Sequence, residues 1–181
     1  MKTIMLGKLG DLTLSAKPNA FIGLALLWII LAGLGWAFLH LPIPAAIIGG
    51  LIAALMHFAS EIIHQFGHAA AAQRTGHPMK GMRFWWILAQ SIYPSDESEL
   101  PPATHVRRAL GGPLISLIVT TVTGVVALLL AAIGGLAYYL AAFAFVDNLF
   151  FFFIGSLLPL GFTDGSTLLR YWGKIKVPSK Q

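Results

Sequence analysis

Two histidines four residues apart are the side chains in this sequence best placed to do chemistry. His64 and His68 enclose the stretch His64-Gln-Phe-Gly-His68 near the end of a long apolar run. On a helix, residues i and i+4 project from the same face one turn apart, so both imidazoles can reach one metal ion. The spacing is that of H-E-x-x-H, in which two histidines bind zinc and the glutamate is the general base. Here the glutamate position holds Gln65.

Asp164 is the best candidate for a third metal ligand. A zinc site needs at least three protein ligands, and a catalytic one leaves a further position open to water. Asp164 lies where the last apolar run is interrupted by a proline and two glycines, whose backbone freedom can present its carboxylate. Two alternatives stay open at this point. Asp164 could simply cap the helix that follows it, and the two histidines could be hydrogen-bonding partners inside a helix bundle.

The composition indicates an integral membrane protein. Of 181 residues, 57% are hydrophobic and only 10% are charged, against about 25% charged in a typical soluble domain. The length predicts a single domain over residues 1–181. The absence of cysteine excludes disulfides and thiolate metal sites. Because the basic residues lie at the ends of apolar runs rather than in one patch, the net charge of +5 does not indicate a nucleic-acid partner.

Four apolar runs are long enough to cross a membrane as helices. The turn at 40–44 and the turn at 134–135 contain no Lys or Arg, whereas basic residues flank the opposite ends of the runs. The positive-inside rule therefore places both termini in the cytoplasm and the histidine pair in the cytoplasmic half of the bilayer. We expect an all-α polytopic membrane protein with transmembrane helices at 21–39, 45–72, 111–133 and 136–158.

The remaining segments predict a small membrane-associated β element on the cytoplasmic side. Residues 1–20 include an alternating stretch at 12–15, which is typical of a short strand. Residues 76–105 are the only sizeable extramembrane segment, and we expect strands or a re-entrant hairpin at 80–93 followed by a polar loop. Residues 165–181 form a basic tail.

Taken together and in this order, the motifs resemble those of the site-2 protease family of intramembrane zinc metalloproteases. That family pairs H-E-x-G-H on one span with N-x-x-P and D-G on another. The corresponding stretches here are 64–68 and Ser156–Gly165, the latter reading Ser156-Leu-Leu-Pro followed by Asp164-Gly165. Gly112-Pro113 resembles the family's G-P motif on the intervening span. The resemblance covers roughly residues 10–170, nearly the whole chain.

The resemblance implies one zinc ion per chain, held by His64, His68 and Asp164. It also implies cleavage of transmembrane segments of membrane-tethered substrates, which must partly unwind to expose the scissile bond. A strand within 80–93 would pair with the extended substrate. Ser156 replaces the family's Asn and would donate a hydrogen bond to a substrate carbonyl. The expected partners are thus a transmembrane protein or peptide and the lipid bilayer.

Gln65 is the departure that matters most for chemistry. A neutral amide cannot accept a proton from water and pass it to a leaving amine, and loss of a positioned base costs about 10²–10⁴ in rate. Because Glu-to-Gln is the change made to trap substrates, we expect a catalytically inactive, engineered form of a protease. The alternatives are a natural pseudoprotease acting as a metal-binding membrane scaffold and an ion transporter. A transporter would more often show internal repeats, and the sequence has none.

Four further polar residues lie within the apolar runs and need an explanation. Glu61 could orient a ligand imidazole, replace the missing base, or be a protonated structural residue. His57 is most simply a hydrogen-bonding residue of the bundle, and Asp147 is expected to pair with it or with a neighbouring span. Asn148 is expected to make a packing contact. In the transporter alternative, His57, Glu61 and Asp147 would form the ion path.

Overall fold

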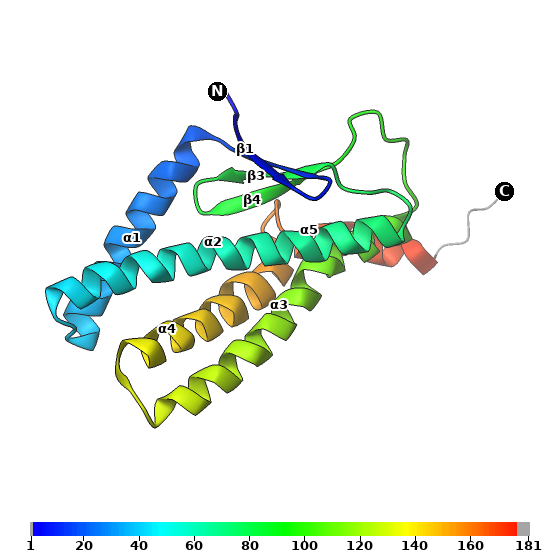
Figure 1. Ribbon diagram of the computed structural model, residues 1–181. Helices are drawn as coiled ribbons and strands as arrows, with labels where there is room; N and C mark the ends of the chain where they lie inside the picture. Colours follow the sequence, from blue (N-terminus) through cyan, green and yellow to red (C-terminus); the bar gives the residue numbers. More distant parts are fainter. Residues whose placement is uncertain (1, 177–181) are drawn as a thin grey trace.

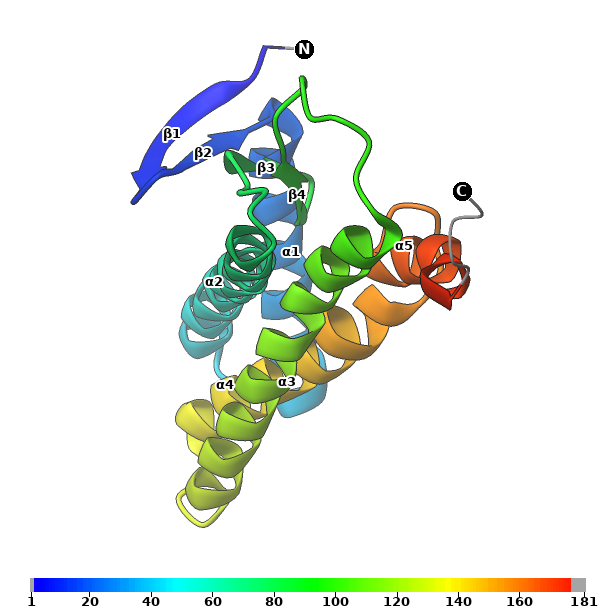
Figure 2. The same ribbon diagram turned by 90° about the vertical axis from the view of Figure 1, so that its right-hand side faces the viewer.

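A single long helix, α2 (Ile43–Arg74), carries both histidines and lies at the centre of the molecule. The computed structural model describes residues 2–176. In Figure 1, α2 runs lengthwise beneath the sheet, with α3 (Pro102–Ala131) and α4 (Gly135–Val146) on its other side. Figure 2, turned by 90°, shows α3 and α4 side by side below the sheet. Helices α3 and α4 and the strand β4 all pack against α2.

Four stretches of helix are long and apolar enough to cross a membrane. They are α1 (Pro18–Leu39), α2, α3, and α4 with its continuation η1, a π-helix over Asp147–Gly155. Large apolar side chains on these helices face outward; Phe38, Leu128 and Leu129 are each about three-quarters exposed. An outward-facing apolar surface of this kind suits lipid and not water. The architecture is that of a multi-pass membrane protein, four long apolar helices with one small sheet.

Two of the helices differ from those expected from the sequence. α3 begins at Pro102 and not near 111, because proline at the first helical position is well tolerated and the preceding proline ends the loop. Arg108 therefore lies inside the helix instead of ahead of it. The fourth apolar helix stays helical through residue 157, close to the expected end at 158, but Asp147–Gly155 within it is π-helical. π-Helical turns are rare and often occur at functional sites.

The strands form one four-stranded sheet in the order β1-β2-β3-β4. The strand expected at 12–15 is β2 (Leu12–Ala16), and β1 (Ile4–Leu9) pairs antiparallel with it as an additional strand. β3 (Gly81–Trp85) and β4 (Leu88–Ile92) form the hairpin within 80–93, and β2 joins β3 in parallel. Buried residues of the sheet, Met82 and Phe84 among them, pack with Ala72 of α2. The sheet thus has two edges, β1 and β4, of which β4 lies against α2.

The chain bends after Gly155 and then forms α5 (Asp164–Tyr171) and a short 3₁₀ turn at Trp172–Lys176. The segment predicted as a basic tail is therefore helical in its first part, and 177–181 lie outside the described residues. Thr163 is the N-cap of α5 and Asp164 is its first helical residue. The alternative in which Asp164 caps the helix is thus not what the structure shows.

Candidate metal centre

The structure brings together the three residues predicted to bind metal. His64 Nε2 lies 3.0 Å from His68 Nε2 and 3.3 Å from an oxygen of Asp164, and His68 Nε2 lies 3.3 Å from the other oxygen of Asp164. Helix α2 supplies the two imidazoles from adjacent turns, as the four-residue spacing requires. The first turn of α5 supplies the carboxylate. Both histidines are buried, and Asp164 is half-buried.

The Nδ1 atoms of both rings face away from this cluster and bond the neighbouring helix α3. His68 Nδ1 is 2.8 Å from the backbone carbonyl of Arg108, and His64 Nδ1 is 2.9 Å from Ser116 Oγ. A carbonyl only accepts, so His68 Nδ1 carries the hydrogen and the Nε2 of the neutral ring presents a lone pair. The two Nε2 atoms and the carboxylate converge on one point, where a cation would be held by ring nitrogens and a negative charge. Outer partners of this kind are typical of metal-bound histidines.

The dimensions of the cluster fit zinc. Tetrahedral coordination with bonds of about 2.0–2.1 Å places neighbouring ligand atoms about 3.3 Å apart, and the three separations are 3.0, 3.3 and 3.3 Å. Two imidazole nitrogens and one carboxylate oxygen are also a ligand set that catalytic zinc uses. Three protein ligands leave one tetrahedral position open.

Glycines let α3 approach the histidines this closely. Gly67 of α2 and Gly111 of α3 face each other, and a Cβ on either would overlap the carbonyl of the other. A Cβ on Gly112 would overlap the Nε2 atoms of both His64 and His68. The backbone of α3 therefore forms one wall of the cluster, and only glycine at 112 leaves that space free.

Gln65 points toward strand β4, where its amide is fully bonded. Its Nε2 donates to Glu61 Oε1 at 3.0 Å and to the carbonyl of Ala89 at 3.1 Å, and its Oε1 accepts a 2.7 Å hydrogen bond from Ser91 Oγ. A carboxylate in the same position could not donate either of the first two bonds. Gln65 thus connects α2 to the edge strand.

Glu61 is buried, with 3% of its surface exposed, and its side-chain hydrogen bond comes from Gln65. The partners of the two ligand histidines are instead Ser116 and the Arg108 carbonyl. The hypothesis that Glu61 orients a ligand imidazole through a hydrogen bond is therefore wrong. Its position one turn before Gln65 gives it a bonding partner on its own helix.

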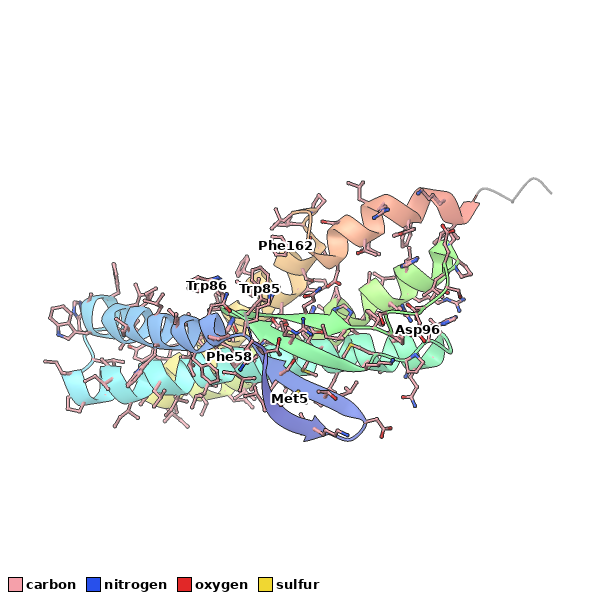
Figure 3. All side chains as sticks on the ribbon, turned by 90° about the horizontal axis from the view of Figure 1, so that it is seen from above. Met5, Phe58, Trp85, Trp86, Asp96 and Phe162 are labelled. Carbon is pink, nitrogen blue, oxygen red and sulfur yellow. The ribbon has the colours of Figure 1, made fainter. Side chains whose placement is uncertain are left out.

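The cluster opens into a cavity of about 950 Å³. Ser156 lines the cavity, and its hydroxyl donates to the carbonyl of Phe153 in its own helix at 3.0 Å. Trp85 and Phe162 lie edge to face at one side of it, 6.2 Å between ring centres, where Figure 3 shows them together. Strand β4 forms another wall through Leu88–Ser91. The cavity is therefore bounded by apolar residues, the edge strand and the metal cluster.

The other end of the cavity is charged. Arg108 donates to Glu97 at 2.9 Å through Nη1, and its guanidinium lies 4.1 Å from the centre of the Tyr93 ring. The hydrogen bond from Arg108 holds the pKa of Glu97 below its usual value. Arg108 thus holds the loop before α3 with its side chain and His68 with its carbonyl.

A second buried His–Asp pair lies deeper along α2. His57 Nδ1 is 3.0 Å from Asp147 Oδ1 and 3.2 Å from Oδ2, which confirms the expected pairing. His57 Nε2 is 2.9 Å from the carbonyl of Ile87 in the turn between β3 and β4. Asn148, predicted to make a packing contact, donates to Ser60 Oγ at 2.9 Å. The bonds of Asp147 and Asn148 connect α2 to the π-helix η1, and the bond to Ile87 connects it to the hairpin.

Sequence reasoning missed two contributors to the cluster. Ser116 follows Gly112 by four residues and so lies on the same face of α3, a spacing that could have indicated it. The Arg108 carbonyl has no sequence signal, because every residue has the same backbone carbonyl group.

The molecule is similar in fold to a structure described as Site-2 Protease from Methanocaldococcus jannaschii. The TM-score is 0.62 at 19% sequence identity, and the match covers 98% of this chain and 74% of that chain. No protein-family model and no curated protein matches the sequence. At this identity the likeness shows a shared fold, and the residues of the cluster must be judged by their own geometry.

Proposed function

We propose that this protein is an intramembrane zinc metalloprotease of the site-2 protease type, catalytically inactive with glutamine at position 65. The observation that carries the proposal is the cluster of His64, His68 and Asp164, whose ligand atoms stand 3.0–3.3 Å apart at the wall of a large cavity. The cluster lies in a chain with four helices apolar and long enough for a membrane. Its fold likeness to a site-2 protease supports the same function.

The roles of the residues follow from their chemistry. One zinc ion per chain would supply a Lewis acid and lower the pKa of water. A glutamate at position 65 would take a proton from the attacking water and deliver it to the leaving amine, which Gln65 cannot do. Ser156 lines the cavity and would donate a hydrogen bond to a substrate carbonyl once it leaves the Phe153 carbonyl.

The proposed substrates are transmembrane segments of membrane-tethered proteins. Both termini would lie in the cytoplasm, because the loops at 40–44 and 134–135 contain no basic residue, and the metal cluster would lie in the cytoplasmic half of the bilayer. A helical substrate hides its backbone, so it must unwind before its peptide bond can reach the cluster. The cavity of about 950 Å³ is large enough to take an unwound segment of a few residues.

Strand β4 is the proposed surface for the unwound peptide. It is an edge of the sheet and also lines the cavity, so the outward backbone groups that α2 does not bond would be open to strand addition. The carbonyl of Ile92 accepts a bond from Lys80 on the β3 side. Backbone groups alternate along a strand, so those of Ala89 and Ser91 face away from β3. The Ala89 carbonyl accepts a bond from Gln65, so the groups of Ser91 would be the ones that pair with a peptide.

A metal-binding membrane scaffold is the second candidate function. The observation that favours it is the surroundings of Gln65, in which two acceptors and one donor match the amide. Such a protein would hold transmembrane clients along β4 without cutting them. In that case glutamine would be the working residue at position 65 and not a disabling one.

Cleavage of a tethered transmembrane substrate by the Gln65→Glu variant tests the proposal. We expect cleavage by Gln65→Glu, a rate about 10²–10⁴ lower with Gln65, and no cleavage when Gln65→Glu is combined with His64→Ala. Zinc in both forms with no cleavage of any tethered substrate by Gln65→Glu would favour the scaffold. Zinc in neither form would contradict both candidates.

A further inference from the structure

The face of α2 that carries Gln65 also carries His57 and Glu61, each four residues from the next. This spacing places all three on one side of the helix, and two of them bond strand β4 or its preceding turn. Gln65 donates to the carbonyl of Ala89, and His57 Nε2 lies 2.9 Å from the carbonyl of Ile87. Ser91 Oγ also donates to Gln65 Oε1, so the hairpin is bonded to α2 at Ile87, Ala89 and Ser91.

The hydrogen positions at His57 follow from its partners. The Ile87 carbonyl only accepts, so His57 Nε2 carries the hydrogen and donates it. Nδ1 faces the carboxylate of Asp147 at 3.0 Å, with 2% of the histidine exposed. Both nitrogens are therefore occupied by the protein, and the ring has no lone pair directed at the cavity. A metal or substrate role for His57 does not fit this bonding.

From this geometry we propose that His57, with Asp147 behind it, is a positioning residue that sets the register of β4 along α2. We call His57, Asp147 and the Ile87 carbonyl the His57 latch. Backbone groups of a strand alternate in direction, so a slip by one residue would turn the Ala89 carbonyl away from α2. A slip by two would move the edge about 7 Å along the metal cluster. The latch prevents both slips from a point remote from the cluster.

The latch matters most where position 65 is not glutamine. With Gln65 present, β4 is also bonded to α2 at Ala89 and at Ser91. A glutamate there could still accept the bond from Ser91 but has no hydrogen to donate to Ala89, so in an active form the His57 latch would carry a larger share of the polar connections from α2 to the hairpin. Its consequence for cleavage rests on the proposed function, whereas its effect on the hairpin does not.

Hydrogen–deuterium exchange of the hairpin, residues 81–92, in the protein with Gln65 tests the latch. His57→Phe keeps an aromatic ring among the rings of Phe58, Phe151 and Phe152, which lie 5.0–5.7 Å from that of His57. We expect exchange of the hairpin amides to be about tenfold faster in His57→Phe, because a buried bond to Ile87 is lost. Asp147→Ala should give a smaller acceleration, since His57 keeps its Nε2–H but loses its support.

Ser60→Ala is the matched control. It removes another buried bond between α2 and η1, that from Asn148, without touching the hairpin. Asp147→Asn is a milder variant, for use if His57→Phe or Asp147→Ala does not fold. Its amide can donate to His57 Nδ1. We therefore expect exchange within about twofold of that in the unmodified protein. Unchanged exchange in His57→Phe would overturn the latch, and so would equal acceleration in Ser60→Ala or an Asp147→Asn variant as fast as Asp147→Ala.

The exchange experiment requires neither zinc nor cleavage, so the latch and the proposed function can fail separately. Applied to Gln65→Glu, His57→Phe should accelerate the hairpin more than it does in the protein with Gln65. An equal or smaller acceleration in Gln65→Glu would contradict the claim that the bonds of His57 and Gln65 both hold β4 in place.

Discussion

Helix α2 contains two buried His–Asp sites that look alike by composition and differ in what the second ring nitrogen does. At His57, one nitrogen meets Asp147 and the other donates to a backbone carbonyl, so the protein uses both. At His64 and His68, Nδ1 bonds α3 and Nε2 points at the other cluster members. The first site holds two parts of the protein together, and the second directs its Nε2 atoms and a carboxylate at one point where a cation can bind. The role of a buried histidine beside an aspartate can therefore be inferred from what its second ring nitrogen bonds.

Replacing one histidine of each site by alanine should give the largest difference in zinc binding between the two sites. We expect His68→Ala to lose zinc, with a drop in affinity beyond the 10–100-fold that loss of an outer partner typically costs, because only two ligands remain. His57→Ala should keep zinc at one per chain. Chelator competition on purified protein measures both variants. Equal zinc loss in the two would mean that the sites do not differ as proposed.

We expect the next largest effect from a substitution at Gly112, where the backbone of α3 forms one wall of the metal cluster. Gly112→Ala puts a methyl group where the Nε2 atoms of His64 and His68 lie, so the rings or α3 must move. We expect a loss of about 1–3 kcal/mol of stability, together with weaker zinc binding. Gly33→Ala is the control, since a Cβ there meets nothing within 4 Å. Thermal unfolding with and without zinc would reveal the difference, and equal behaviour of the two variants would argue against the close approach of α3.

Much of the metal cluster could be predicted from the sequence, whereas its supports could not. The four-residue spacing of His64 and His68 defines a shared helix face, and Asp164 stands at a break in an apolar run. The carbonyls of Arg108 and Ile87 are backbone groups that leave no mark in the residue types. The early start of α3 at Pro102 was missed because hydropathy shows where a helix is apolar and not where it begins. Likewise the pairing of β2 with β3 depends on contacts between distant segments.

Ser116 should contribute less than a ligand. Ser116→Ala removes the partner of His64 Nδ1 but leaves all three metal-binding side chains in place. We expect zinc affinity to fall about 10–100-fold. Thr121→Ala, on an exposed face of the same helix where the hydroxyl bonds only Leu117, should have no effect. If the two variants bind zinc equally well, Ser116 does not orient His64.

The smallest expected effect is at the water-side end of α3, where Arg108 bonds Glu97. Since the pKa of Glu97 is lowered in the folded protein by Arg108, the pair adds stability above the usual pKa of glutamate. That stability is lost as pH falls through the lowered value. Because Arg108 is buried and the Glu97 side chain is largely covered, the loss of solvation offsets much of the attraction, and the net contribution is small. Unfolding midpoints measured against pH should fall slightly more steeply at acid pH for the unmodified protein than for Glu97→Gln, and parallel curves would show that the pair adds nothing.

X-ray absorption at the zinc edge of the purified protein, in the form with Gln65, tests the metal centre most directly. The cluster predicts about one zinc per chain, with two imidazole nitrogens and oxygen ligands at about 2.0–2.2 Å, and loss of the imidazole signal in His64→Ala. A zinc-free protein, or zinc whose spectrum shows no histidine, would contradict the assignment of His64, His68 and Asp164 as its ligands.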